Sequence, residues 1–181
     1  QKITLTSSPY DWLEASFFYT NIQDKPYPGF EFQDYKDKGF NFKIKLKDEG
    51  RLPSIAIGIN DIAGTGYFSS EYIVGSYGID NLDIHFGLGF GTLNGSNKSF
   101  KNPLSYLYDS FNNRPVNDGG LGGQFQPSRY FSGEDVSPFY GISYAFNEKL
   151  LLKFEHDSTK TDGLIEYEVP GKRDSMAVEY K

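Results

Sequence analysis

Large apolar residues alternate with polar or glycine residues in two stretches of the chain, residues 38–47 and 82–91. In the first stretch, Phe40, Phe42 and Ile44 are separated by asparagine and lysine. A β-strand sends successive side chains to opposite faces, so each stretch predicts a strand with one apolar face and one polar or empty face. Because the alternation recurs along most of the chain, we predict an all-β protein.

Nine segments of the chain carry this alternation, some clearly and some weakly. Residues 68–77 are the least regular, since the pattern assigns Tyr72 and Val74 to the apolar face and Glu71 to the polar face, whereas Ile73 breaks it. The predicted strands are residues 2–6, 12–20, 39–47, 54–60, 68–77, 82–91, 136–146, 150–157 and 175–180.

The connections between these strands alternate between short and long. The short ones are rich in turn-forming residues and suit hairpins. Short turns at one end and long loops at the other predict a single meander of antiparallel strands, the arrangement of outer-membrane β-barrels. The short connections are residues 7–11, 48–53, 78–81 and 147–149, and the long ones are residues 21–38, 61–67, 92–135 and 158–174.

Two architectures fit this alternation, a transmembrane β-barrel and a soluble antiparallel β-sandwich. The up-and-down order differs from the Greek-key crossings common in sandwiches. Glycines on the inward face, such as Gly87 and Gly89, suit a bent barrel wall. We therefore favour an antiparallel up-and-down transmembrane β-barrel. Nine strands is an odd number, so residues 1–181 are expected to form one segment of a larger barrel, completed by further strands of the protein or by another chain.

The composition narrows the function classes. The chain has no cysteine, which excludes disulfides and thiolate metal sites, and its net charge of −6 argues against nucleic-acid binding. No stretch reaches the roughly 18 apolar residues of a transmembrane helix. Aromatic residues make up 17% of the chain, and some fall near predicted strand ends, where membrane barrels carry aromatic girdles: Tyr10, Trp12, Tyr19, Tyr77, Tyr144 and Tyr180.

The sequence shows no catalytic constellation. Asp83 and His85 share a face, but neighbours on one face of a strand are about 7 Å apart, too far for a direct hydrogen bond. With only 2 histidines, a transition-metal site is not expected, and the glycine runs lack the lysine and helix of a phosphate loop. We expect a non-enzymatic protein without a metal or cofactor.

Two groups of residues remain as candidates for binding. Polar residues on the predicted inner face either contact a polymer or pair with one another to fill the interior: Glu14, Asn41, Lys43, Lys45, Asn60, Glu71, Asp83, His85, Lys153 and Glu155. Aromatic residues of the longest loop either stack on sugar rings or fold the loop over the barrel mouth: Tyr106, Tyr108, Phe111, Phe125, Tyr130 and Phe131.

Several motifs resemble the YjbH/GfcD family of outer-membrane β-barrel lipoproteins. They are WLEASFFYT at residues 12–20, YKDKGF at 35–40, LPSIAIGINDIAGTG at 52–66, FSSEY at 68–72, GLGFG at 87–91 and FSGEDV at 131–136. The match covers most of residues 12 to 157 in consistent order, and residues 52–91 are its most specific part.

The resemblance implies an outer-membrane protein of a Gram-negative bacterium that assists exopolysaccharide or group 4 capsule secretion. Its implied partners are outer-membrane lipid, a polysaccharide, and a polysaccharide-export channel with periplasmic accessory proteins. Members of the family are several times longer than this chain. The leading hypothesis is a scaffold, conduit or docking site for secretion; the alternatives are a secreted β-sandwich carbohydrate-binding module using Tyr106 and Tyr108, and a general porin.

Overall fold

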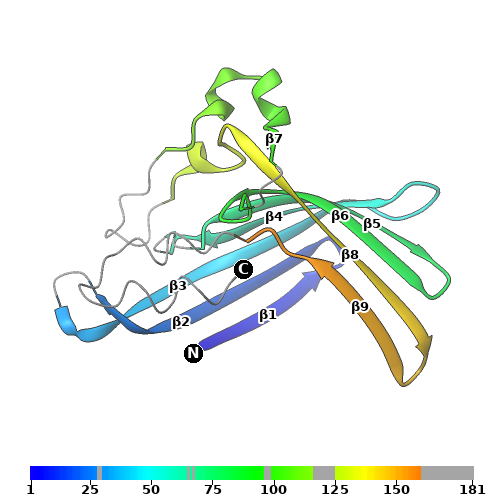
Figure 1. Cartoon of the computed structure of the whole chain (residues 1–181), viewed down its shortest axis with the longest axis horizontal. Coiled ribbons are helices and arrows are strands. Elements are labelled where there is room, and N and C mark those ends of the chain that lie inside the picture. The colour runs from blue at the N-terminus through cyan, green and yellow to red at the C-terminus, as the bar shows by residue number, and fades with distance from the viewer. Residues whose placement is uncertain (28–29, 65, 67, 96–98, 116–124, 160–181) are drawn as a thin grey trace.

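A single antiparallel sheet curls into a half-barrel in the computed structural model of the chain (Figure 1). The structure describes residues 1–27, 30–64, 66, 68–95, 99–115 and 125–159. Its strands are β1 (Lys2–Tyr10), β2 (Leu13–Tyr27), β3 (Phe30–Lys47), β4 (Ser54–Ile62), β5 (Ser70–Ile79), β6 (Leu82–Gly91), β7 (Phe100–Lys101), β8 (Asp135–Asn147) and β9 (Leu150–His156).

The strands follow the predicted meander, since β1 to β6 pair in sequence order and β8 pairs with both β6 and β9. Eight of the nine predicted strands are present, and the ninth, residues 175–180, lies outside the described residues. The short turns lie at one end of the sheet, and the tip of the β2–β3 hairpin lies at the opposite end (Figure 1). No helix in the described residues is long and apolar enough to cross a bilayer.

The prediction of a long loop at residues 21–38 is wrong. The β2–β3 ladder continues through this segment, with Asn21 opposite Lys36 and Ile22 opposite Tyr35. Proline and charged residues suggested a loop, but the register shifts between Ile22 and Pro26. A bulge of this kind lets a hairpin accommodate a proline that donates no ladder hydrogen bond.

The two faces of the sheet differ in polarity. One row of the convex face runs through Ile44, Ile57, Ile73 and Leu88 on four successive strands. These residues face away from the groove on the other side of one curled sheet, and no second sheet covers them in the described part of the chain. The β-sandwich alternative is therefore not supported. Many large side chains of the convex face are exposed, including Ile3, Leu5, Phe17, Phe40, Leu46, Ile55, Ile84, Phe86, Ile142, Leu152 and Phe154.

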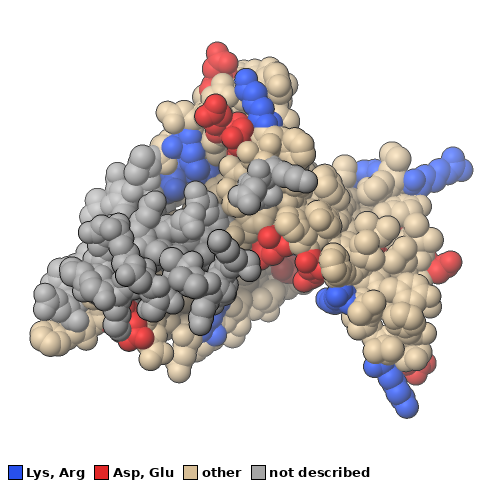
Figure 2. All heavy atoms as spheres, viewed as in Figure 1, with Lys and Arg blue, Asp and Glu red and all other residues tan. Residues whose placement is uncertain are grey.

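Charged side chains are sparse over part of the sheet. Figure 2 shows a largely uncharged surface over the right-hand hairpins, with Lys, Arg, Asp and Glu gathered near the turns at their tips. The fully buried apolar side chains are few and lie toward the long-loop end. There Phe18 packs edge-on against Phe68, and Phe90 packs edge-on against Phe131 of the β7–β8 connection. The packed core thus joins loop to sheet rather than sheet to sheet.

Candidate functional site

The concave face carries most of the polar residues singled out from the sequence. Register places Glu14 opposite Lys43, and Lys43 opposite Gly58 on the next strand. His85 and Glu155 lie opposite Gly141 from its two sides, and Asp83 and Lys153 lie opposite Ser143 in the same way. Nine of the ten predicted residues share this face: Glu14, Asn41, Lys43, Lys45, Asn60, Asp83, His85, Lys153 and Glu155.

Glu71 is the exception, and its assignment to the polar face is wrong. It lies opposite Ile59 on β4 and Phe90 on β6, so it belongs to the convex apolar face. The faces of β5 are reversed from the prediction, because Tyr72 and Val74 point to the concave side and Ile73 to the convex side. The alternation along β5 gave the wrong faces because both faces of this strand carry large apolar side chains.

A groove of about 500 Å³ runs along the concave face. A second hollow of about 260 Å³ continues it toward the short turns, and the two share Lys43, Val74 and Ser76. The groove is lined by aromatic and polar side chains together, which include Lys43, Asn60, Tyr72, His85, Phe139 and Glu155. Trp12, Tyr10 and Glu14 line the second hollow.

The polar side chains of the concave face make their described polar contacts with other residues rather than with one another. Asn41 donates a hydrogen bond to Ser16 and Asn60 donates one to Ser70, at 3.3 and 3.0 Å. Lys45 forms an ion pair with Asp48 at the nearby turn. Among the described residues, no ion pair joins two of the nine concave residues to each other. The groove therefore presents separate hydrogen-bond donors and acceptors to a ligand that enters it.

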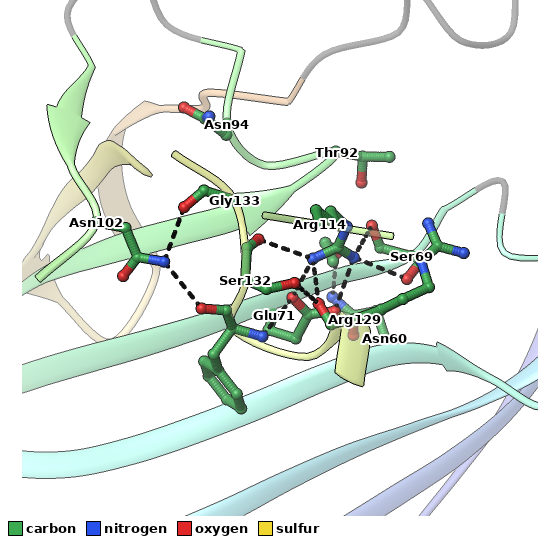
Figure 3. Close-up of polar contacts among 12 residues, drawn as sticks. Asn60, Ser69, Glu71, Thr92, Asn94, Asn102, Arg114, Arg129, Ser132 and Gly133 are labelled. Atoms are coloured by element: carbon green, nitrogen blue, oxygen red, sulfur yellow. Dashed lines mark hydrogen bonds and ion pairs between the residues drawn. The ribbon is translucent and has the colours of Figure 1, made fainter. Parts of the chain in front are cut away.

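Arg114 of the long β6–β8 connection forms a two-pronged ion pair with Glu71 (Figure 3). Its Nη1 and Nη2 atoms lie 2.7 and 2.9 Å from the two carboxylate oxygens, and Glu71 is completely buried. Arg114 also donates to the carbonyl of Arg129 and the hydroxyl of Ser69, and the backbone N–H of Phe131 donates to Glu71. This cluster fixes the connection to the end of β5.

Asn102 is a second anchor of the same connection. It is completely buried, and its Nδ2 lies 3.0–3.2 Å from the carbonyl oxygens of Phe111, Phe131 and Gly133. Its Oδ1 accepts the N–H of Leu104 at the start of η1 (Pro103–Tyr106). One side chain thus ties η1 and η2 (Asp109–Asn112) to the segment that leads into β8.

Burial shifts the titration of two side chains beside this cluster. Burial and the neighbouring Arg114 lower the pKa of Arg129, whose Nε has no hydrogen-bond partner among the described residues. Burial and the nearby Glu71 carboxylate raise the pKa of Tyr130. Both shifts arise because the connection is packed against the sheet instead of hanging free in solvent.

The loop aromatics do not line the concave groove. Tyr106, Tyr108 and Phe125 are 75%, 70% and 65% exposed, and the ammonium of Lys101 lies 5.3 Å from the centre of the Tyr106 ring. Phe111 and Tyr130 are half-buried, and Phe131 packs on Phe90. Phe131 packs on β6, while Tyr106 and Tyr108 stay on the surface, so contact with sugar rings and folding over the barrel mouth both stay predictions for these aromatics.

Arg114, Asn102 and Ser69 were not predicted from the sequence. Each is a common residue type in a segment rich in Gly, Asn, Pro or Ser, and no local pattern marks it. An arginine in such a loop, together with a glutamate that fits an apolar strand face poorly, is the one signal that points to the pair. Within the described residues, no group of three His, Asp or Glu side chains is placed to hold a metal ion.

Changing Asn102 is expected to loosen the connection. Asn102→Ala removes donors to buried carbonyls, at a cost of about 1–3 kcal/mol. Asn102→Asp should cost more, because a buried carboxylate would face three carbonyl oxygens. Hydrogen exchange of the amides in residues 100–112 measures both effects. Equal protection in Asn102→Asp and the unmodified protein would contradict the anchoring role.

Comparison with known proteins identifies the family of the chain. The family model described as "Exopolysaccharide biosynthesis protein YbjH" matches residues 1–162. The chain is 36% identical over 154 residues to the protein named "Uncharacterized lipoprotein YjbH" of Escherichia coli (strain K12), which covers 82% of this chain and 22% of that protein. The chain thus spans about a fifth of the relative's length, and no solved structure matches it significantly. The resemblance found in the sequence is confirmed: the chain belongs to the YjbH family of exopolysaccharide biosynthesis proteins.

Proposed function

We propose that this chain is part of an outer-membrane β-barrel that takes part, without catalysis, in exopolysaccharide secretion as a scaffold or conduit. The proposal rests on one observation: a single curled sheet has an apolar convex face and a polar concave face. The convex face exposes large apolar side chains such as Leu5 and Phe154, each 68% exposed, while the concave face is a polar groove. Lipid outside and water or polymer inside satisfy both faces.

Strand lengths support a membrane location. β4, β5 and β6 contain 9, 10 and 10 residues, and a tilted transmembrane strand needs about 9–11. Aromatic pairs lie near the short turns, where Tyr10 stacks on Trp12 and Tyr144 packs edge-on against Phe146. Tyrosine and tryptophan favour the boundary between lipid and water, because they combine an apolar ring with a polar group.

The open edges of the sheet support a larger barrel. In the described residues β1 pairs only with β2 and β9 only with β8, so each has one unpaired edge. Unpaired backbone groups are very costly in lipid, and barrels avoid this cost by closing. The remaining strands would come from the rest of the protein, consistent with the greater length of the relative, or from another chain.

The role in secretion rests on the family description together with the groove. The family is described by exopolysaccharide biosynthesis, and the matched relative is named a lipoprotein. A groove with separate donors and acceptors suits a hydroxyl-rich polymer. In this proposal the protein works beside a polysaccharide-export channel and periplasmic accessory proteins, which would receive or deliver the polymer.

Membrane fractionation tests the proposal on the whole protein in cells that secrete polymer. We expect the protein in the outer-membrane fraction, released only by detergent, with faster gel migration before heating than after. Deleting its gene should lower secreted exopolysaccharide. Recovery of the protein as a soluble monomer without detergent would overturn the proposal.

A further inference from the structure

Three rings on the concave face fill the space that neighbouring glycines leave empty. A Cβ atom added to Gly58 would collide with the ring of Tyr72, and one added to Gly87 would collide with the ring of Phe139. A Cβ on Gly141 would likewise collide with the imidazole of His85. Glycine on one strand thus lets a ring from the next strand lie against the wall of the groove.

Two of these rings meet near the middle of the groove. Tyr72 and Phe139 contact each other with ring centres 6.0 Å apart and planes at 89°, an edge-to-face pair. Both line the groove of about 500 Å³, a volume within the range of about 300–1,000 Å³ that ligand sites occupy. Because each ring occupies the place of a missing side chain, the pair is fixed in position before any ligand arrives.

The groups around the two rings match a sugar. Lys43 and Asn60 supply N–H donors, Glu155 supplies carboxylate acceptors, and His85 can do either. A sugar ring has C–H groups on its faces, which pack on aromatic rings, and hydroxyls at its rim that both donate and accept. Since the two carboxylates Glu155 and Asp157 outnumber the one ammonium of Lys43 in the same groove, a neutral sugar suits it better than a polyanion.

We propose that Tyr72 and Phe139 form a stacking platform for neutral sugar units of the secreted polymer in the concave groove. This inference rests on the proposed function and names the contact surface within it. The exposed loop aromatics Tyr106 and Tyr108 are then not the main polymer contact, because they lie outside the groove.

Photo-crosslinking in secreting cells tests the contact directly, with the cells' own exopolysaccharide, labelled from radioactive glucose, as the probe. A photoreactive phenylalanine replaces Ser76, which lines the groove, or its neighbour Tyr77, which lies on the convex face, or Tyr106 of the loop. We expect labelled adducts from position 76 only. Adducts from position 106 without adducts from position 76, or no adducts from either, would overturn the platform.

Substitutions test the two rings themselves. Tyr72→Leu combined with Phe139→Leu should lower the yield of adducts from position 76 about tenfold, since two aromatic contacts of this kind are worth roughly 1.4 kcal/mol together. Phe86→Leu on the convex face should leave the yield within about twofold of the parent. An unchanged yield in the double variant would overturn the platform.

Fractionation of the same cells separates the two failures. If the double variant reaches the outer membrane with normal heat-modifiable migration and still binds polymer, the platform fails while the proposed function stands. If the unmodified protein never reaches the outer membrane, the proposed function fails. If the double variant does not insert into the membrane, the crosslinks from position 76 in the otherwise unmodified protein still show whether the polymer contacts the groove.

Discussion

Replacing Arg114 by methionine is expected to destabilise the long-loop end of the half-barrel by about 3–5 kcal/mol. The variant leaves the completely buried carboxylate of Glu71 without its cation, although Phe131 still donates one N–H to it. It also removes donors to the carbonyl of Arg129 and the hydroxyl of Ser69. Residues 100–115 should then become sensitive to protease, which limited digestion of the whole protein in lipid vesicles measures.

The matched control changes both members of the pair. Glu71→Leu with Arg114→Met places apolar side chains where two charges were buried, and such exchanges are often neutral or stabilising. We expect the double variant to recover most of the lost protease resistance. A single variant as resistant as the parent would show that the ion pair does not hold the connection.

The clear strands of the sheet were predictable because each separates two different environments. β6 has the predicted limits of residues 82–91, and β4 and β9 agree with prediction within two residues at each end. The alternation is most regular in β6, where one face is apolar and the other is polar or glycine. A local period of two is all that such a strand needs to specify its faces.

The β2–β3 hairpin shows where local signals fail. Pro26 and the surrounding charges are typical of loops, yet backbone pairing of β2 with β3 continues beyond them. Tyr35 of this segment is 1% exposed and Asp37 is likewise buried, so tertiary packing supports strand geometry there. The residues next to Tyr35 and Asp37 in the sequence do not indicate this packing.

The Glu71–Arg114 cluster could not be predicted from spacing, because its members are 43 residues apart in the chain. The same holds for Asn102, which binds carbonyls 9 to 31 residues away. The faces of β5 were reversed for a related reason. Tyr72 has a large, mainly apolar side chain, but it lies in the polar groove over Gly58 of the neighbouring strand. Its face is therefore set by packing between strands and not by the alternation along β5.

Phe86→Arg has the second largest expected effect and tests whether the convex face meets lipid. Phe86 is in the middle of β6 and is 54% exposed, so in water an arginine there would cost little beyond the lost apolar contacts. In a bilayer, arginine on the outer face near the midplane costs about 2–4 kcal/mol. The free energy of unfolding of the whole protein in phospholipid vesicles, measured with guanidinium, gives the value.

His85→Arg is the matched control, because His85 is the preceding residue of the same strand and faces the concave groove. A charge there stays in water, so we expect a change within about 1 kcal/mol. The difference in free energy of unfolding between the two variants therefore measures the cost of placing a charge in lipid on one side of the strand. The two positions are neighbours and the introduced side chain is the same. Equal losses in both variants would mean that the convex face sees no hydrocarbon. The apolar stripe would then have to be covered by protein, which would overturn the outer-membrane location.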